Sequence, residues 1–175
     1  EDNWYASNAG GFDSILNVNS SDNDEVITAV DKVIASYGQS QNGEDQVLVQ
    51  KFLSDVQSSG VVFTCSLETG ASYYRINFDD KTNSTESVTA GFDAELRTVI
   101  IHKDGKPFIN KLEPKLSKLV DAVSELEILL NFDKLDIEFA IDCNGVVNIF
   151  QVRPITVDHS EYNFTDEMIQ SSLAS

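Results

Sequence analysis

The chain has 175 residues, of which 41% are hydrophobic, and a formal net charge of −17 at pH 7. It is long enough and apolar enough to bury a core, so one globular domain or slightly more is predicted rather than a disordered chain. Its acidity argues against nucleic acid and anionic membranes as partners, since both need a basic surface, but not against a nucleotide whose charge a metal ion and an arginine neutralise.

In chain order, residues 1–18 predict a loop around Gly10 and Gly11 that leads into an apolar segment. A helix is predicted from Asp24, or a neighbouring cap residue, to Gly38, because its apolar residues recur at helical spacing. A polar connection follows at 38–45. The apolar runs 46–53 and 59–67 predict two strands that pair across the polar turn between them.

Two further strands are predicted at 72–80 and 94–103, on either side of a turn-rich loop at 81–87. A helix with one apolar face is predicted over about 113–131, and a short C-terminal helix over 165–175. This order of elements predicts the α+β class, with a largely antiparallel sheet and flanking helices.

A hairpin is predicted over residues 135–156. Apolar residues at 135, 137, 139 and 141 alternate with polar or small ones, which is the period of a strand with one buried side. Asn144 and Gly145 fit a two-residue turn, because both central positions of such a turn favour positive φ. That turn predicts that Cys143 pairs with Val146.

The predicted register gathers four polar side chains on one face of the hairpin. Glu138 lies opposite Gln151 and Asp136 lies opposite Arg153, with partners about 5 Å apart. A carboxylate beside an amide oxygen suits a hard cation, and an arginine suits phosphate oxygens. On register alone, a solvated sheet face with an ordinary Asp136–Arg153 ion pair is the alternative.

The two cysteines, Cys65 and Cys143, do not make a disulfide framework, and the sequence has no signal peptide or long apolar span. A cytoplasmic location is therefore expected, and the glycosylation sequons at 19, 83 and 163 are interpreted as chance. The first residue is not methionine, so we expect that residue 1 marks a boundary inside a larger protein.

The hairpin motif "LDIEFAID-NG-FQVRPIT" resembles the end of the ATP-grasp domain of phosphoenolpyruvate synthases and pyruvate phosphate dikinases. "VLVQKFLSDVQSSGVVFT" at 47–64 and "EDNWYASNAGGFDSILNV" at 1–18 are similar to two other motifs of that family, and "TESVTAG" at 85–91 is a weaker match. The matches follow the family's order along nearly the whole chain.

The resemblance implies Mg²⁺ and ATP as cofactors, bound by the hairpin. Glu138 and Gln151 match the family's magnesium ligands, and Arg153 matches its contact to the transferring phosphates. Asp136 matches an acid at the same site.

The resemblance also implies nucleotide contacts outside the hairpin. A hinge whose backbone meets adenine corresponds to Gln50, Lys51, Phe52 and Leu53. Gly60 corresponds to a close approach of backbone to nucleotide, and Glu86 to an acid on the nucleotide side. Gly10 and Gly11 match a loop that closes over the phosphates. Each of these positions also has a purely structural interpretation, as an exposed strand residue, a bulge or turn glycine, a surface acid or a linker.

By this resemblance, residues 1–45 end the preceding ATP-grasp portion, 46–156 form the nucleotide- and metal-binding subdomain, and 157–175 lead toward the next domain. The whole parent would be an ATP-dependent phosphotransferase that passes phosphate to a carrier histidine on another domain and then to a small acceptor, pyruvate or another. The isolated chain lacks the lid and the carrier histidine, so we expect it to be inactive.

Three segments depart from the family pattern, namely 37–46, 65–67 and 83–85. None lies in the hairpin, so ATP use is still expected, but the pyruvate reaction is placed in doubt. A divergent kinase for another small molecule, such as an amide or a sugar, and a non-catalytic nucleotide-binding module both stay open. A secreted β-rich binding domain that uses the sequons is disfavoured by the lack of a secretion signal.

Overall fold

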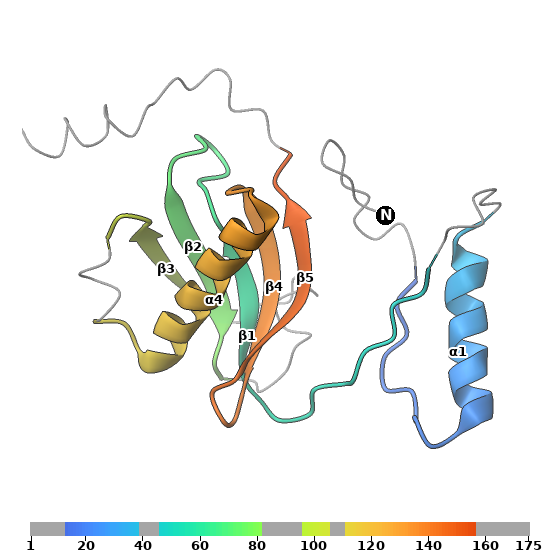
Figure 1. The fold of residues 1–175 in the computed structure, drawn as a ribbon. Coiled ribbons are helices and arrows are strands. Elements are labelled where there is room, and N and C mark those ends of the chain that lie inside the picture. The colour runs from blue at the N-terminus through green and yellow to red at the C-terminus, as the bar shows by residue number, and fades with distance from the viewer. Residues whose placement is uncertain (1–12, 39–45, 82–95, 106–110, 157–175) are drawn as a thin grey trace, which may run out of the picture. The chain divides into compact units, whose positions relative to one another are not determined.

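The computed structural model of the chain describes residues 13–38, 46–81, 96–105 and 111–156 (Figure 1). It divides into two compact units, Glu1–Ser54 and Asp55–Ser175. The C-terminal helix predicted over 165–175 lies outside the described residues.

The first unit contains one described helix, α1 (Asn23–Ser36). Asp22 caps its first turn by accepting hydrogen bonds from the backbone N–H groups of Asp24 and Glu25. Beyond the C-cap residue Tyr37, Gly38 has φ +67°, the left-handed conformation that commonly follows the end of a helix. The helix predicted from the cap near Asp24 to Gly38 is therefore confirmed.

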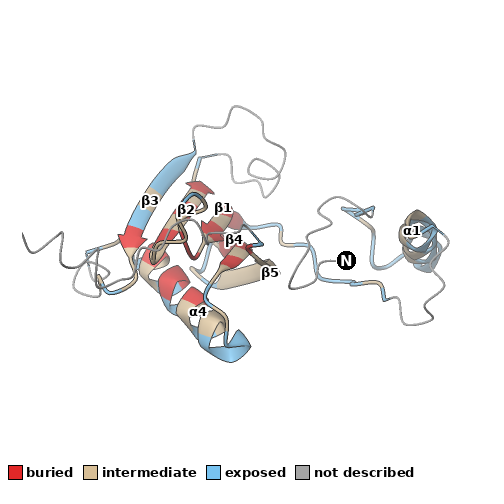
Figure 2. Ribbon diagram, turned by 90° about the horizontal axis from the view of Figure 1, so that it is seen from above, coloured by how far each residue is buried: buried red, intermediate tan, exposed pale blue. Residues whose placement is uncertain are grey.

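The second unit is a five-stranded sheet with one described helix, α4 (Pro114–Leu130), across one face (Figures 1 and 2). The strands are β1 (Val56–Phe63), β2 (Tyr73–Asp79), β3 (Arg97–His102), β4 (Leu135–Asp142) and β5 (Val147–Pro154). Their order is β3-β2-β1-β4-β5, and every neighbouring pair is antiparallel. The predicted α+β class with an antiparallel sheet is confirmed.

The core lies between α4 and the sheet. The helix buries Leu116, Leu119, Val120 and Val123, at the helical spacing seen in the sequence. The strands contribute alternate residues, such as Leu135, Ile137, Phe139 and Ile141 of β4, which are at most 1% exposed. Each such side chain contributes about 1.5–3 kcal/mol of transfer free energy. The other residues of each strand consequently point to the opposite face.

The strand predicted over 46–53 is wrong. Residues 46–55 have no regular secondary structure, and Leu48 and Val49 are 77% and 72% exposed. The predicted partner, β1, pairs with β2 along one edge and with β4 along the other. Because both edges of β1 are occupied, a strand at 46–53 has no place beside it.

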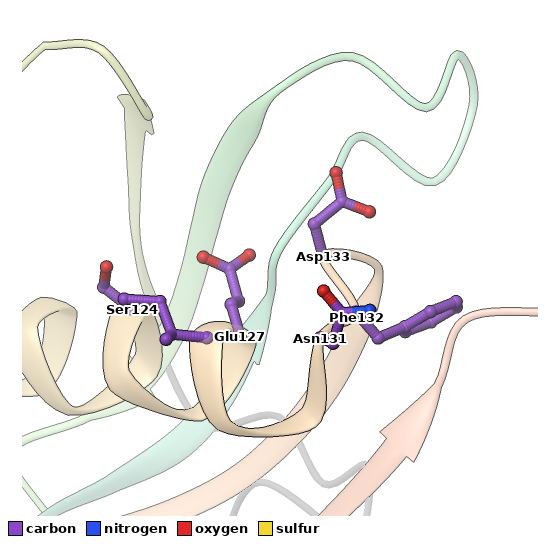
Figure 3. Close-up of a pocket in the computed structure, with 6 residues that line it drawn as sticks. Ser124, Glu127, Asn131, Phe132 and Asp133 are labelled. Carbon is purple, nitrogen blue, oxygen red and sulfur yellow. The ribbon is translucent and has the colours of Figure 1, made fainter.

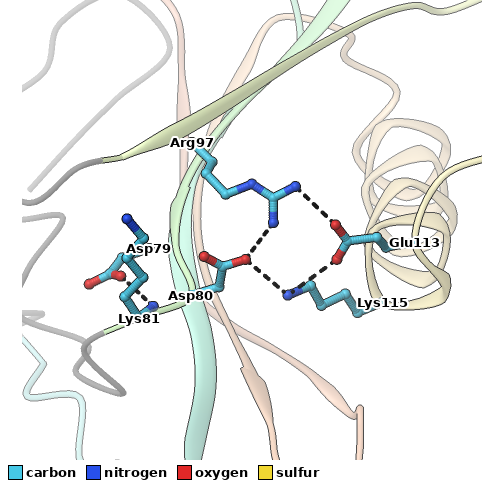
Figure 4. A network of polar contacts seen from close by, with 6 residues as sticks. All are labelled: Asp79, Asp80, Lys81, Arg97, Glu113 and Lys115. Carbon is cyan, nitrogen blue, oxygen red and sulfur yellow. Dashed lines mark hydrogen bonds and ion pairs between the residues drawn. The ribbon is translucent and has the colours of Figure 1, made fainter.

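A four-residue charge network holds the edge of the sheet to the start of α4 (Figure 4). Arg97 donates to Asp80 at 2.5 Å and to Glu113 at 2.9 Å, and Lys115 lies 3.4 Å from each carboxylate. The Arg97 and Lys115 cations lie 5.0 and 5.7 Å from the centre of the Phe78 ring. The network thus closes over one end of the core.

We expect this network to make stability fall in acid. Burial raises the pKa of Asp80, but hydrogen bonds from Arg97 and Lys115 outweigh it, and the resulting pKa lies below the usual value. The hydrogen bond from Arg97 lowers the pKa of Glu113 in the same way. Both carboxylates have lower pKa values in the folded than in the unfolded chain. The stability that they contribute is therefore complete above their ordinary pKa values of about 4, and it is lost as the pH falls through the lowered pKa values of the folded state.

Asp80→Asn is accordingly expected to cost about 1 kcal/mol at pH 7, a modest amount because solvent screens part of the network. The difference from wild type should shrink as the pH falls below about 4. Urea unfolding between pH 7 and pH 3 measures it, with Asp121→Asn on the exposed side of α4 as the control. A stability difference that is independent of pH would contradict the assignment.

Candidate functional site

The four hairpin residues of the predicted site, Asp136, Glu138, Gln151 and Arg153, alternate with the core-facing residues of β4 and β5 and so lie on the opposite face of the sheet. This face, which we call the polar face, points away from α4 (Figure 2). Two rows of directly paired residues cross the five strands on this face. The first row is Thr98, Asn77, Val61, Glu138 and Gln151. The second row is Ile100, Arg75, Phe63, Asp136 and Arg153. Members of a row are side-chain neighbours because paired residues share a face.

The turn of the hairpin differs from the predicted one. Asp142, not Cys143, pairs with Val146, whose carbonyl accepts from the Asp142 N–H at 3.0 Å. The Asp142 carboxylate accepts from the N–H groups of Asn144 and Val146, both at 2.9 Å, and Gly145 has φ +74°. The turn therefore has three central residues, because an aspartate cap and a left-handed glycine stabilise the longer form.

A bulge in β5 compensates for the longer turn. Phe139 pairs with Ile149 while Glu138 pairs with Gln151, so Phe150 is the extra residue. The one-residue shift at the turn and the one-residue shift at the bulge cancel. Glu138 lies opposite Gln151, and Asp136 lies opposite Arg153, as the sequence predicted.

Arg153 contacts the side chains of Gln151 and Glu138. Arg153 Nη2 donates to Gln151 Oε1 at 2.7 Å and lies 3.9 Å from Glu138 Oε1. The side chains of Arg153 and Glu138 are only 20% and 26% exposed. Asp136, opposite Arg153, is also partly buried. The cluster is thus sheltered enough for its charges to act more strongly than surface charges do.

The side-chain oxygens of Glu138 and Gln151 are suitable ligands for a magnesium ion, but both already lie close to the guanidinium of Arg153. Glu138 and Gln151 supply a carboxylate and an amide oxygen on adjacent strands, which are hard ligands of the kind that Mg²⁺ takes together with phosphate oxygens and water. Nη2 of Arg153 contacts both, so a metal ion there requires the guanidinium to turn away. No group of three or more His, Cys, Asp or Glu side chains that could hold a metal occurs among the described residues.

Two side chains of the polar face were missed by the sequence reasoning. Arg75 and Asn77 of β2 lie in the same rows as the hairpin residues. The Asn77 side-chain oxygen accepts from the Thr98 hydroxyl at 2.9 Å, which leaves its amide nitrogen to donate elsewhere. The alternation of residues 72–80 could have placed both on one face, but only the pairing of β1 with β2 and β4 relates that face to the hairpin.

Gly60 lies on the other face of the sheet from the hairpin cluster. It pairs with Phe78 and Phe139, both fully buried beneath α4. A Cβ atom at Gly60 would come within 2.2 Å of the Asn77 carbonyl oxygen and 2.8 Å of Phe78. The close approach of β2 therefore explains why a residue without a side chain stands at this position.

The other predicted nucleotide contacts lie in the first unit or outside the described residues. The hinge residues Gln50, Lys51, Phe52 and Leu53 belong to the first compact unit and lie in its irregular segment. Glu86, Gly10 and Gly11 lie outside the described residues.

An open pocket of about 480 Å³ lies away from the hairpin cluster, at the end of α4 (Figure 3). Its lining includes Glu127, Ile128 and Phe132. The Glu127 carboxylate accepts from Lys103 and from the Tyr74 hydroxyl, each at 2.6 Å. Burial, together with Glu127, raises the pKa of Tyr74. Glu127, Tyr74 and Lys103 therefore bind one another, and these contacts join the end of α4 to β2 and to the residue that follows β3.

The chain matches no protein-family model, and no curated protein matches it. The resemblance to the ATP-grasp family therefore depends on the sequence motifs alone. None of the described helices is both long and apolar enough to cross a membrane.

Proposed function

We propose that this chain is the MgATP-binding part of an ATP-grasp phosphotransferase similar to phosphoenolpyruvate synthase. The full protein would transfer phosphate from ATP to a carrier histidine on another domain, and from there to a small acceptor, pyruvate or another. Such a reaction suits the cytoplasmic location expected from the sequence.

The observation that carries the proposal is the contact of Arg153 with Gln151 and its closeness to Glu138, on one face of two paired strands. A carboxylate, an amide oxygen and a guanidinium are together what a metal–phosphate group needs for recognition. An ordinary surface ion pair needs only the two charges. The sheltered position and the family's order of motifs favour the functional interpretation over that alternative.

In the proposed site, Glu138 and Gln151 would hold the magnesium ion, which when bound neutralises charge on the phosphate oxygens. Arg153 would leave Gln151 and donate both arms of its guanidinium to the transferring phosphate. Asp136, directly opposite Arg153, would orient that guanidinium. The contribution of these residues is positioning and charge stabilisation, which is the main requirement of phosphoryl transfer.

The test is ATP turnover by the full protein that contains this chain, against a panel of small acceptors that includes pyruvate, amides and sugars. Glu138→Gln is expected to lower turnover by roughly 10²-fold or more, since it removes the metal ligand's charge. Arg153→Ala is expected to lower it by about 10³-fold. Glu125→Gln, an exposed acid on α4, is the control and should leave turnover unchanged. Unchanged turnover in both site variants would remove the assignment.

The panel also separates the two other functions. Turnover with an acceptor other than pyruvate would indicate the divergent kinase, and nucleotide binding without turnover would indicate the non-catalytic module. The 175-residue chain alone is expected to bind ATP weakly and to turn nothing over. A tight, magnesium-dependent ATP titration of this chain would contradict the proposal that the site is only half contained in it.

A further inference from the structure

A second group of donors lies on the polar face, at β2 and β3 rather than at the hairpin. Tyr73 pairs with His102, and the two rings meet edge to face with centroids 4.9 Å apart. Arg75, two residues along β2 from Tyr73, shares that face and is a diagonal neighbour of His102. The side chain of Arg75 is 40% exposed and that of His102 is 21% exposed.

Each side chain has a buried donor for which the described residues supply no acceptor. Nε of Arg75 and Nε2 of His102 are shielded from solvent and have no hydrogen-bond partner in the part of the chain that the structure describes. His102 Nδ1 accepts from the Asp104 N–H at 3.2 Å, so the proton of the neutral imidazole is on Nε2. An unsatisfied buried donor costs about 1–3 kcal/mol, and two of them on neighbouring strands favour an acceptor that the described residues do not supply.

The nearby carboxylates do not fill this role. Glu68 approaches Arg75 Nη1 only to 3.9 Å, and its side chain is 71% exposed. Hydrogen bonds from its own backbone and from Ser66, more than Arg75, lower the pKa of Glu68. Asp104 lies 4.0 Å from His102 Nδ1, on the side of the ring away from Nε2.

We propose that Arg75 and His102 form a binding site for a small oxyanion, a phosphate or a carboxylate. Because Arg75 Nε and His102 Nε2 are shielded from solvent, both side chains would turn to admit the anion. Arg75 would then offer its Nε–H and one Nη–H as a planar fork, and His102 would add a third donor from Nε2. The site lies three strands from Arg153, a separation of about 14 Å at ordinary strand spacing. It is thus distinct from the proposed magnesium site and does not depend on the proposed phosphotransfer.

The experiment follows the imidazole signals of the 175-residue chain by NMR at pH 7.5 while sodium phosphate or sodium acetate is added at constant ionic strength. Sodium chloride is the reference salt. The chain has two histidines, and His102→Gln assigns the signals. We expect a saturable shift of the His102 signal with millimolar affinity and no matching shift of His159. Saturation by phosphate alone, by acetate alone or by both identifies which oxyanion the site accepts.

Arg75→Ala and Arg75→Lys should each weaken anion binding about tenfold, since neither retains the fork. The lysine variant keeps the charge and the aliphatic stem, which guards against loss of folding. Glu68→Gln should strengthen binding a few-fold, because it removes a competing charge. Arg153→Ala should leave the His102 shift unchanged.

The absence of a saturable shift, or an undiminished shift in both Arg75 variants, overturns this proposal without touching the proposed function. A His102 shift that is lost with Arg153→Ala but kept with Arg75→Lys would place the anion at the hairpin instead. That result too would overturn the second site, while it would support a phosphate contact at Arg153.

Discussion

Replacement of Gly60 by alanine is expected to destabilise the second unit by about 3 kcal/mol or more, near the upper end for single substitutions. The added Cβ would lie 2.2 Å from the Asn77 carbonyl oxygen and 2.8 Å from Phe78 Cα. Both are backbone atoms of the neighbouring strand, so no side-chain rotation relieves the clash. The strands must separate, and β1 is the central strand of the sheet.

Thermal and urea unfolding monitored by circular dichroism would measure this effect. Gly145→Ala is the matched control, because Gly145 has φ +74° but an added Cβ would meet only the flexible end of Lys118, at 3.5 Å. Its cost should be about 1–2 kcal/mol, from the left-handed backbone alone. Equal stability losses in the two variants would show that β2 does not approach Gly60 as closely as described.

The hairpin shows how far the sequence could predict the site. The alternation of 135–141 placed Asp136 and Glu138 on one face, and the contact partners Gln151 and Arg153 followed from counting across the turn. The count assumed a two-residue turn and a regular strand, and both assumptions were wrong by one residue. The bulge at Phe150 has no local sequence signal, since it depends on how β5 packs, so the correct pairing was reached through two errors that cancel.

The segment 46–53 shows why the order of the strands was harder to predict. Its apolar residues have strand character, yet nothing in a short apolar run says which edges of the sheet are free. That information comes from long-range pairing, here of β1 with β4, about 80 residues away in the chain. That pairing, together with the pairing of β1 with β2, places Arg75 and Asn77 in the same rows as the hairpin residues, with β1 between them, which is why the sequence alone did not include them in the site.

The substitution of Arg153 by alanine is expected to have opposite effects on metal and nucleotide. Nη2 of Arg153 donates to Gln151 and lies 3.9 Å from Glu138, so the guanidinium occupies the oxygens that a metal ion would use. Its removal should tighten binding of free Mn²⁺ to the 175-residue chain by about tenfold, which corresponds to about 1.4 kcal/mol of lost repulsion. The same change should slow ATP turnover by the full protein, as argued above.

Manganese binding to the chain can be measured by electron paramagnetic resonance, which reports the free ion. Arg153→Lys keeps the positive charge without the planar fork, so Mn²⁺ affinity should stay near that of the wild type while turnover still falls. The tighter metal binding of Arg153→Ala should disappear when Glu138→Gln is added, because the carboxylate supplies the negative charge. If Arg153→Ala binds Mn²⁺ no better than wild type, the guanidinium does not compete with a metal ion, and Glu138 and Gln151 are only its ion-pair and hydrogen-bond partners. An ordinary surface ion pair predicts this unchanged affinity, whereas a metal–phosphate site requires tighter Mn²⁺ binding by Arg153→Ala.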